Sequence, residues 1–330
     1  MDRDQHELQF LGFLSVYRET STTILKWRKI FAQITLTLIL PLCIVFLALS
    51  DVTQLFSSEI VIYDINQEDT WKYSPRYRDL SSMLKNFWLI ELGFFISISV
   101  SLPSISAVVY TVACVYAAKQ ITFKKIMSIL PRVWKRLMVT FFWCFALFFV
   151  YNVVAIGLLI VWLVIVGEYL VGPTLGITVA VILLILYVVG FAYITMIWQL
   201  ANVISVLEDA YGRKAMAKSK GLLRGKMGLS VWCFLGVLMC SVLFQALFES
   251  LVVLDSVPTG IRIAAGLICL LLLSMLVLFD LVVQTVIYFV CKSYHHENID
   301  SSCLSDHLEV CLEDCPSEGR KAVQLEQLQV

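Results

Sequence analysis

The fold is decided by residues 190–228, GFAYITMIWQLANVISVLEDAYGRKAMAKSKGLLRGKMG, where a hydrophobic span ends and a polar connector begins. The apolar residues run out near Val203, and the acidic pair Glu208-Asp209 follows. A run of small and basic residues then leads to a second hydrophobic span that starts at Leu229. Two spans joined by a basic connector predict a helical hairpin in a membrane, and the rest of the chain repeats this arrangement.

The composition indicates that much of the chain lies in a bilayer. The 330 residues are 59% hydrophobic and 15% charged, whereas soluble chains carry about 25% charged residues. A soluble domain could not cover so much apolar surface, and only helices and closed barrels satisfy their backbone groups in lipid. The long apolar stretches therefore predict an all-α polytopic integral membrane protein.

Six stretches reach the roughly 20 apolar residues that crossing a bilayer requires. They predict six transmembrane helices at about 30–50, 88–116, 138–166, 174–204, 229–251 and 261–290. Together they form a transmembrane domain over 30–290, preceded by an N-terminal amphipathic segment, 1–29. Pro41 lies inside the first span and should kink it.

The positive charges are sorted between the connectors. Alternate segments carry 20 Lys and Arg residues on one side of the membrane and 5 on the other. Because cytosolic loops are enriched in Lys and Arg, both termini are expected in the cytosol. Segment 51–87 is then expected on the opposite side.

Two segments outside the spans show helical amphipathicity. In residues 8–25, one predicted face holds Phe10, Phe13, Leu14, Tyr17 and Ile24. In residues 119–137, the apolar sector comprises Phe123, Ile126, Met127, Leu130, Val133, Trp134 and Leu137, with only Ile129 and Pro131 off the pattern. This pattern predicts helices that lie in the membrane interface.

The polar sector of 119–137 predicts contact with anionic lipid headgroups, because it is cationic or small. The expected contacts are Lys124, Lys125, Arg132, Lys135 and Arg136. The alternative is an ordinary connector packed on the helix bundle. Connector 205–228 differs, since its small residues favour close packing, and two short helices against the bundle are expected there.

Polar groups inside the spans are candidates for function, because they are costly in lipid. Asp280 and Gln284 lie one turn apart in the sixth span, and Asn152 lies near the middle of the third. One interpretation is a path for protons or a small solute, with Asp280 as its main group. The other is a set of hydrogen bonds between helices.

The tail, 291–330, is acidic and is expected to be mostly disordered and cytosolic. Cys291, next to Lys292 at the end of the last span, is a candidate for palmitoylation. Cys303, His307, Cys311 and Cys315 are zinc-ligand types, but on one helix they would spread over about 18 Å. Neither a metal nor another cofactor is expected.

The segment from Trp198 to Lys226 resembles a family of uncharacterised six-span plant membrane proteins. Their N-terminal helix is similar to LGFLSVYRET and WRKIF of this chain. More distantly, the segment around Glu208, Ala215, Ser219 and Gly225 is similar to the membrane domain of some bacterial glycerophosphodiester phosphodiesterases. Their catalytic domain has no counterpart here, so the resemblance implies the topology and no activity.

These observations predict a non-enzymatic protein, because no common catalytic motif is present. Its expected role is membrane organisation, scaffolding or trafficking in the endoplasmic reticulum, another endomembrane or the plasma membrane. The expected partners are anionic membrane lipids, and proteins through the cytosolic termini, but not nucleic acid. The alternative is a small-solute or proton transporter that uses Asp280 and Asn152.

Overall fold

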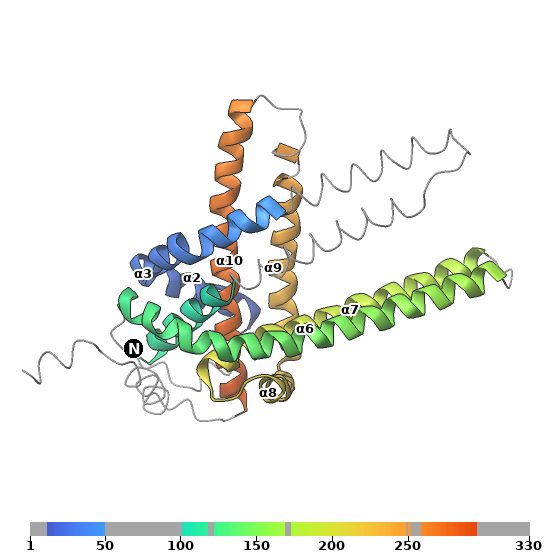
Figure 1. Ribbon diagram of the computed structural model, residues 1–330, viewed down its shortest axis with the longest axis horizontal. Helices are drawn as coiled ribbons and strands as arrows, with labels where there is room; N and C mark the ends of the chain where they lie inside the picture. The colour runs from blue at the N-terminus through green and yellow to red at the C-terminus, as the bar shows by residue number, and fades with distance from the viewer. Residues whose placement is uncertain are drawn as a thin grey trace, which may run out of the picture. The chain divides into compact units, whose positions relative to one another are not determined.

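The computed structural model describes residues 12–49, 101–117, 122–168, 173–248, 250–251 and 259–295. These residues are almost entirely helical, and no strand occurs among them (Figure 1). The labelled elements are α2 (Phe13–Lys26), α3 (Arg28–Ile34), η1 (Thr35–Ile39), α6 (Phe123–Glu168), α7 (Pro173–Leu207), α8 (Arg213–Leu223), α9 (Met227–Phe248) and α10 (Thr259–Tyr294). The expected all-α class is therefore confirmed.

Five of the described helices are long and apolar enough to cross a membrane. They cover Arg28–Leu49, Val133–Val166, Thr174–Leu207, Met227–Phe248 and Gly260–Tyr294, which correspond to five of the six predicted spans. For the span predicted at 88–116, only the apolar helix Ser101–Tyr116 falls within the described residues. The predictions for loop 51–87 and for the tail beyond 295 lie outside them.

The first span contains a π-helical turn just before Pro41. In η1 the ladder shifts register, and the N–H of Leu40 donates to the carbonyl of Thr35. Proline has no N–H to continue an α-helical ladder, and a wider turn is one way for a helix to absorb an interruption. The helix thus continues to Leu49.

The chain divides into two compact units. One comprises Met1–Leu25, Ser106–Leu235 and Leu281–Val330. Its core is the second half of α10, where Val282, Val286 and Val290 are fully buried. In this unit α6 and α7 run side by side as a long antiparallel hairpin, with α8 beside the end of α7 (Figure 1).

The other unit comprises Lys26–Ile105 and Gly236–Asp280. Along its first span, Phe31, Ile34, Ile39 and Cys43 are buried. In its part of α10, Ile263, Leu267 and Leu271 are largely exposed. Exposed side chains of this kind suit a lipid environment.

Helix α6 differs from the prediction at its start. It runs for 46 residues from Phe123 without interruption, so the basic segment and the third span form one helix rather than a surface helix followed by a span. Pro131 lies within this helix. The sequence pattern indicated the helical period correctly. It contained no signal that the basic segment and the third span would form one continuous helix.

Candidate functional site

Glu208 lies directly after α7 and joins three segments of its unit. Its Oε1 accepts hydrogen bonds from the hydroxyl of Tyr288 at 2.7 Å and from Nζ of Lys292 at 2.9 Å, both in α10. Its Oε2 faces Nζ of Lys218, in α8, at 2.8 Å. One carboxylate therefore ties the end of α7 to α8 and α10.

The cations around Glu208 control its protonation. The Glu208 side chain is 14% exposed, and Lys292 is 18% exposed. Burial alone would raise the pKa of this carboxyl group, but hydrogen bonds from Lys218, Lys292 and Tyr288 outweigh it and hold the pKa below its ordinary value. Glu208 is therefore a stable anion at neutral pH.

A second polar network connects the turn before α8 to α6. The backbone N–H of Gly212 donates to Oγ1 of Thr140 at 2.8 Å, and Oγ of Ser205 lies 2.7 Å from the same oxygen. Gly212 adopts a φ of +60°, which suits glycine at this turn. The turn therefore has a fixed attachment to α6 as well as to α10.

Helix α8 packs on its unit through small residues, as the sequence predicted for connector 205–228. Ala215 and Ser219 are fully buried, and the Ser219 hydroxyl donates to the carbonyl of Ile197 at 2.9 Å. Two helices were expected in this connector, but α8 is the only one, and turns flank it on both sides. Glu208, Ala215 and Ser219 thus hold this junction together.

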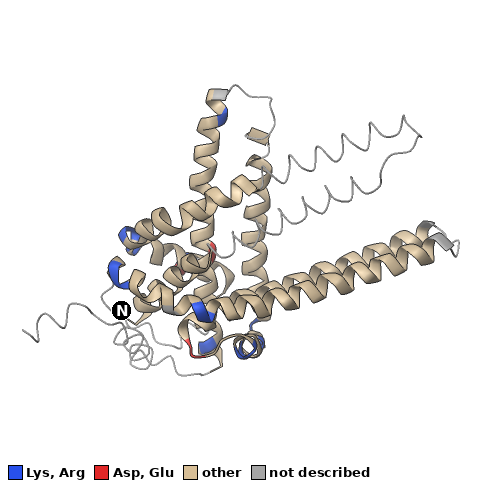
Figure 2. Ribbon diagram, in the orientation of Figure 1, with Lys and Arg blue, Asp and Glu red and all other residues tan. Residues whose placement is uncertain are grey.

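The basic start of α6 carries most of the predicted headgroup contacts. Lys124, Lys125 and Lys135 are exposed, and Trp134, the neighbour of Lys135 in the chain, is 41% exposed. Figure 2 shows Lys and Arg at this end of α6 and on α8, and none farther along the α6–α7 hairpin. The described side chains thus place three predicted cations on an exposed surface next to an aromatic residue.

The remaining two predicted cations are placed differently. Arg136 binds Asp209, with 2.6 Å between Nη1 and Oδ1, and its side chain is 39% exposed. Lipid contact at Arg136 would therefore have to compete with this ion pair. The side chain of Arg132 lies outside the described residues, so its contact stays a prediction.

The buried face of α6 is rotated from the predicted apolar sector. Ile126, Ile129 and Val133 are buried, whereas Met127 is 38% exposed. Ile129, which did not fit the predicted sector, therefore belongs to the buried face. The predicted apolar sector included Met127 and Trp134, but both side chains turn outward.

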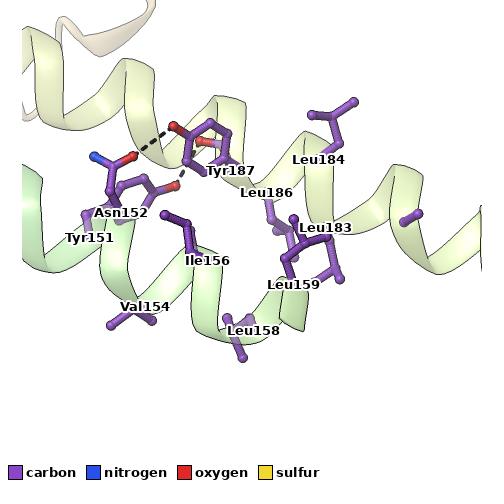
Figure 3. Close-up of a pocket in the computed structure, with 12 residues that line it drawn as sticks. Tyr151, Asn152, Val154, Ile156, Leu158, Leu159, Leu183, Leu184, Leu186 and Tyr187 are labelled. Atoms are coloured by element: carbon purple, nitrogen blue, oxygen red, sulfur yellow. Dashed lines mark hydrogen bonds between the residues drawn. The ribbon is translucent and has the colours of Figure 1, made fainter. Parts of the chain in front are cut away.

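Asn152 takes part in hydrogen bonds within the α6–α7 hairpin. Its Oδ1 accepts from the hydroxyl of Tyr187 at 3.0 Å, and its Nδ2 donates to the carbonyl of Phe148 at 2.8 Å. The hydroxyl of Tyr151 donates to the carbonyl of Tyr187 at 2.8 Å. Asn152, Tyr151 and Tyr187 border an open groove of about 710 Å³ that is otherwise lined by aliphatic side chains and alanines (Figure 3).

The other predicted intramembrane residues lie in α10. Asp280 and Gln284 are half-buried. Cys291 is fully buried, and acylation requires an exposed thiol. Palmitoylation of Cys291 therefore stays a prediction that needs this packing to open.

Sequence reasoning singled out Glu208 but not its partners. Tyr288 and Lys292 lie 80 and 84 residues later, and a single sequence contains no signal that joins them to Glu208. A weak signal did exist, since Tyr288 and Lys292 are spaced by one helical turn and therefore share a face. The junction combines a carboxylate at the end of one span with this pair at the end of another.

The described part of the chain is helical and contains five helices of membrane-spanning length, which is the architecture of a multi-pass membrane protein. The chain belongs to the family described as Domain of unknown function (DUF8558), which matches residues 1–328. No curated protein and no solved structure matches it.

Proposed function

We propose that the protein is a non-enzymatic membrane protein that gathers anionic lipid headgroups at the basic start of α6. In this proposal both termini and this end of α6 face the cytosol, where anionic lipids are concentrated. The observation that carries the proposal is that Lys124, Lys125 and Lys135 are exposed at the start of α6, with the exposed Trp134 next to Lys135. Cations beside an amphipathic aromatic ring suit the headgroup region of a bilayer.

The length of α6 supports this placement. Its 46 residues correspond to about 69 Å, whereas the hydrocarbon core is about 30 Å thick. The apolar part of the helix therefore fills the bilayer, and the basic start extends beyond it. Lys135 lies about 16 Å nearer to the hydrocarbon than Lys124. Headgroups should therefore contact Lys135 in preference to Lys124.

The test measures lipid affinity directly in purified protein. Short-chain phosphatidylserine is titrated against the full chain in neutral detergent micelles, with short-chain phosphatidylcholine as the neutral reference. A triple variant, Lys124→Glu with Lys125→Glu and Lys135→Glu, should bind phosphatidylserine at least about fivefold more weakly, since each cation near an anionic surface contributes about 1 kcal/mol. Affinity for phosphatidylcholine should not change.

A graded comparison makes the test sharper. Lys135→Glu alone should weaken phosphatidylserine binding more than Lys124→Glu alone, because Lys135 lies nearer to the bilayer. Arg136→Gln should have a small effect, since Arg136 is held by Asp209. Unchanged phosphatidylserine affinity in the triple variant would show that this surface does not bind headgroups.

Transport is the second proposal, and Asp280 favours it because this acidic residue lies within the candidate span Gly260–Tyr294. At the other predicted position, Asn152 accepts a hydrogen bond from Tyr187 of α7, which favours a contact between helices there. In proteoliposomes, Asp280→Asn should abolish a proton or solute flux if Asp280 carries it. An unchanged flux would eliminate that mechanism.

A further inference from the structure

Helix α8 presents a basic face that the proposed headgroup site does not use. Its exposed cations are Arg213, Lys214, Lys220 and Arg224, and the exposed residues between them include Ala217 and Gly221. The opposite face, with Ala215 and Ser219, is buried. A Cβ atom added at Gly221 would meet nothing within 4 Å. The face is therefore exposed and strongly positive.

This face lacks the apolar anchors of a membrane-binding helix. No large hydrophobic side chain between Arg213 and Leu223 is exposed, and the exposed ones nearest in sequence, Tyr211 and Met227, lie beyond the two ends. The one exposed aromatic side chain that the described residues place against a cation of this face is Trp143 of α6, whose ring centre lies 5.4 Å from the guanidinium carbon of Arg213 at the amino end. Helices that lie in a bilayer interface insert an apolar face beside their cations, as Trp134 could do on α6. The α8 face therefore suits an acidic protein segment better than a bilayer.

The described chain ends beside this helix. Nε2 of His295 lies 2.9 Å from the carbonyl oxygen of Arg224 and 3.1 Å from that of Leu222. Nζ of Lys226 lies 5.2 Å from the centre of the Tyr294 ring. Residue 296 therefore leaves the described structure at the carboxyl end of α8.

The residues that follow have the complementary charge. Segment 297–318 contains no Lys or Arg and seven acids, namely Glu297, Asp300, Asp306, Glu309, Glu313, Asp314 and Glu318. Helix α8 has 11 residues and is about 16 Å long, a distance that roughly five extended residues cover. The segment is long enough to follow the whole basic face.

We propose that segment 297–318 docks along the exposed basic face of α8, running from Arg224 towards Arg213. The direction follows from the position of His295, which lies beside the carboxyl end of α8. A segment running in this direction brings acids to the amino end of α8, where the helix dipole favours negative charge. The docked segment covers the cations of α8 and leaves the lysines of α6 open. The proposal does not depend on lipid binding by α6.

Zero-length crosslinking of the full chain tests this arrangement. A carbodiimide joins a carboxyl group to a lysine amine in contact with it, and mass spectrometry of the peptides identifies the pair. In neutral detergent, segment 297–318 should crosslink to Lys214 or Lys220. The double variant Arg213→Glu with Arg224→Glu keeps both lysines but reverses half of the charge, and the yield should fall at least about fivefold.

The matched control carries the same charge change on α6. Lys124→Glu with Lys125→Glu should leave the crosslinks to Lys214 and Lys220 unchanged. Gel filtration establishes that each variant remains monodisperse. As a second measurement that needs no substitution, 0.5 M NaCl should lower the yield in the wild-type chain, because salt screens exposed charges.

Three outcomes would overturn the proposal. The first is an unchanged crosslink yield in the Arg213→Glu and Arg224→Glu variant or at high salt. The second is crosslinking only between isotope-labelled and unlabelled copies, which would place the segment on a neighbouring molecule. The third is a loss of phosphatidylserine affinity in this variant as large as that in the α6 triple variant, which would make α8 a lipid-binding surface.

Discussion

At the scale of single residues, Glu208 ties the end of α7 to α8 and α10. It neutralises charge on Lys218 and Lys292, whose side chains are 33% and 18% exposed. Glu208→Gln would leave two partly buried cations without their counter-ion, which should cost about 2–3 kcal/mol, less than for a fully buried pair because water reaches both lysines. Thermal unfolding in detergent, followed by tryptophan fluorescence, should show a lower Tm.

The matched control for this prediction is Lys220→Gln on the exposed face of α8. It removes a charge from the same helix and should leave the Tm within error, because exposed surface changes contribute little. Equal Tm values for wild type and Glu208→Gln would contradict the role of Glu208 as the link between α7, α8 and α10.

The pH dependence of stability should reveal the same carboxylate. Because its neighbours hold the pKa of Glu208 below 4.5 in the folded state, the unfolded state binds the proton more readily. The stabilisation is therefore complete above the unfolded pKa and is lost as pH falls through the folded pKa. The difference in unfolding free energy between wild type and Glu208→Gln should be constant near neutral pH. It should shrink towards zero below pH 4.5. A difference that persists unchanged in acid would contradict this assignment.

At the scale of elements, the turn from α8 to α9 is fixed by Gly225. Its φ is +94°, and an added Cβ would lie 2.5 Å from a ring carbon of Tyr294. Gly225→Ala should therefore lower the free energy of unfolding by about 1–3 kcal/mol. Gly221→Ala, in α8 with open space around it, is the matched control and should be neutral or slightly stabilising. Equal stability of the two variants would show that the turn tolerates a side chain.

The elements also show what the sequence could and could not predict. Hydrophobic length predicted the spans because backbone groups in lipid must be satisfied within a helix. Small residues correctly predicted that α8 would pack closely. The rotation of α6, with Ile129 buried and Met127 exposed, could not be predicted, because an apolar residue suits a protein contact and lipid equally well. The partners of Glu208 could not be predicted either, because they come from distant parts of the chain.

At the scale of the whole molecule, orientation is the feature that the charge distribution predicts and that can be tested most directly. The chain offers two acceptor sites for N-glycosylation that need a single change each, Glu68→Thr after Asn66 and Asp300→Thr after Asn298. The 20 to 5 division of Lys and Arg places the first on the lumenal side and the second in the cytosol. Only Glu68→Thr should therefore gain a glycan, seen as a gel shift that an endoglycosidase reverses.

Each other result has a definite meaning for the topology. A glycan only on Asp300→Thr would invert the whole molecule and turn the basic start of α6 away from the cytosolic leaflet, where anionic lipids are concentrated. Glycans on both variants would place the two segments on the same side and would require an even number of crossings between them, instead of the five that the predicted spans give. A glycan on neither would contradict the predicted lumenal position of the first segment, because the glycosylation machinery acts only in the lumen of the endoplasmic reticulum.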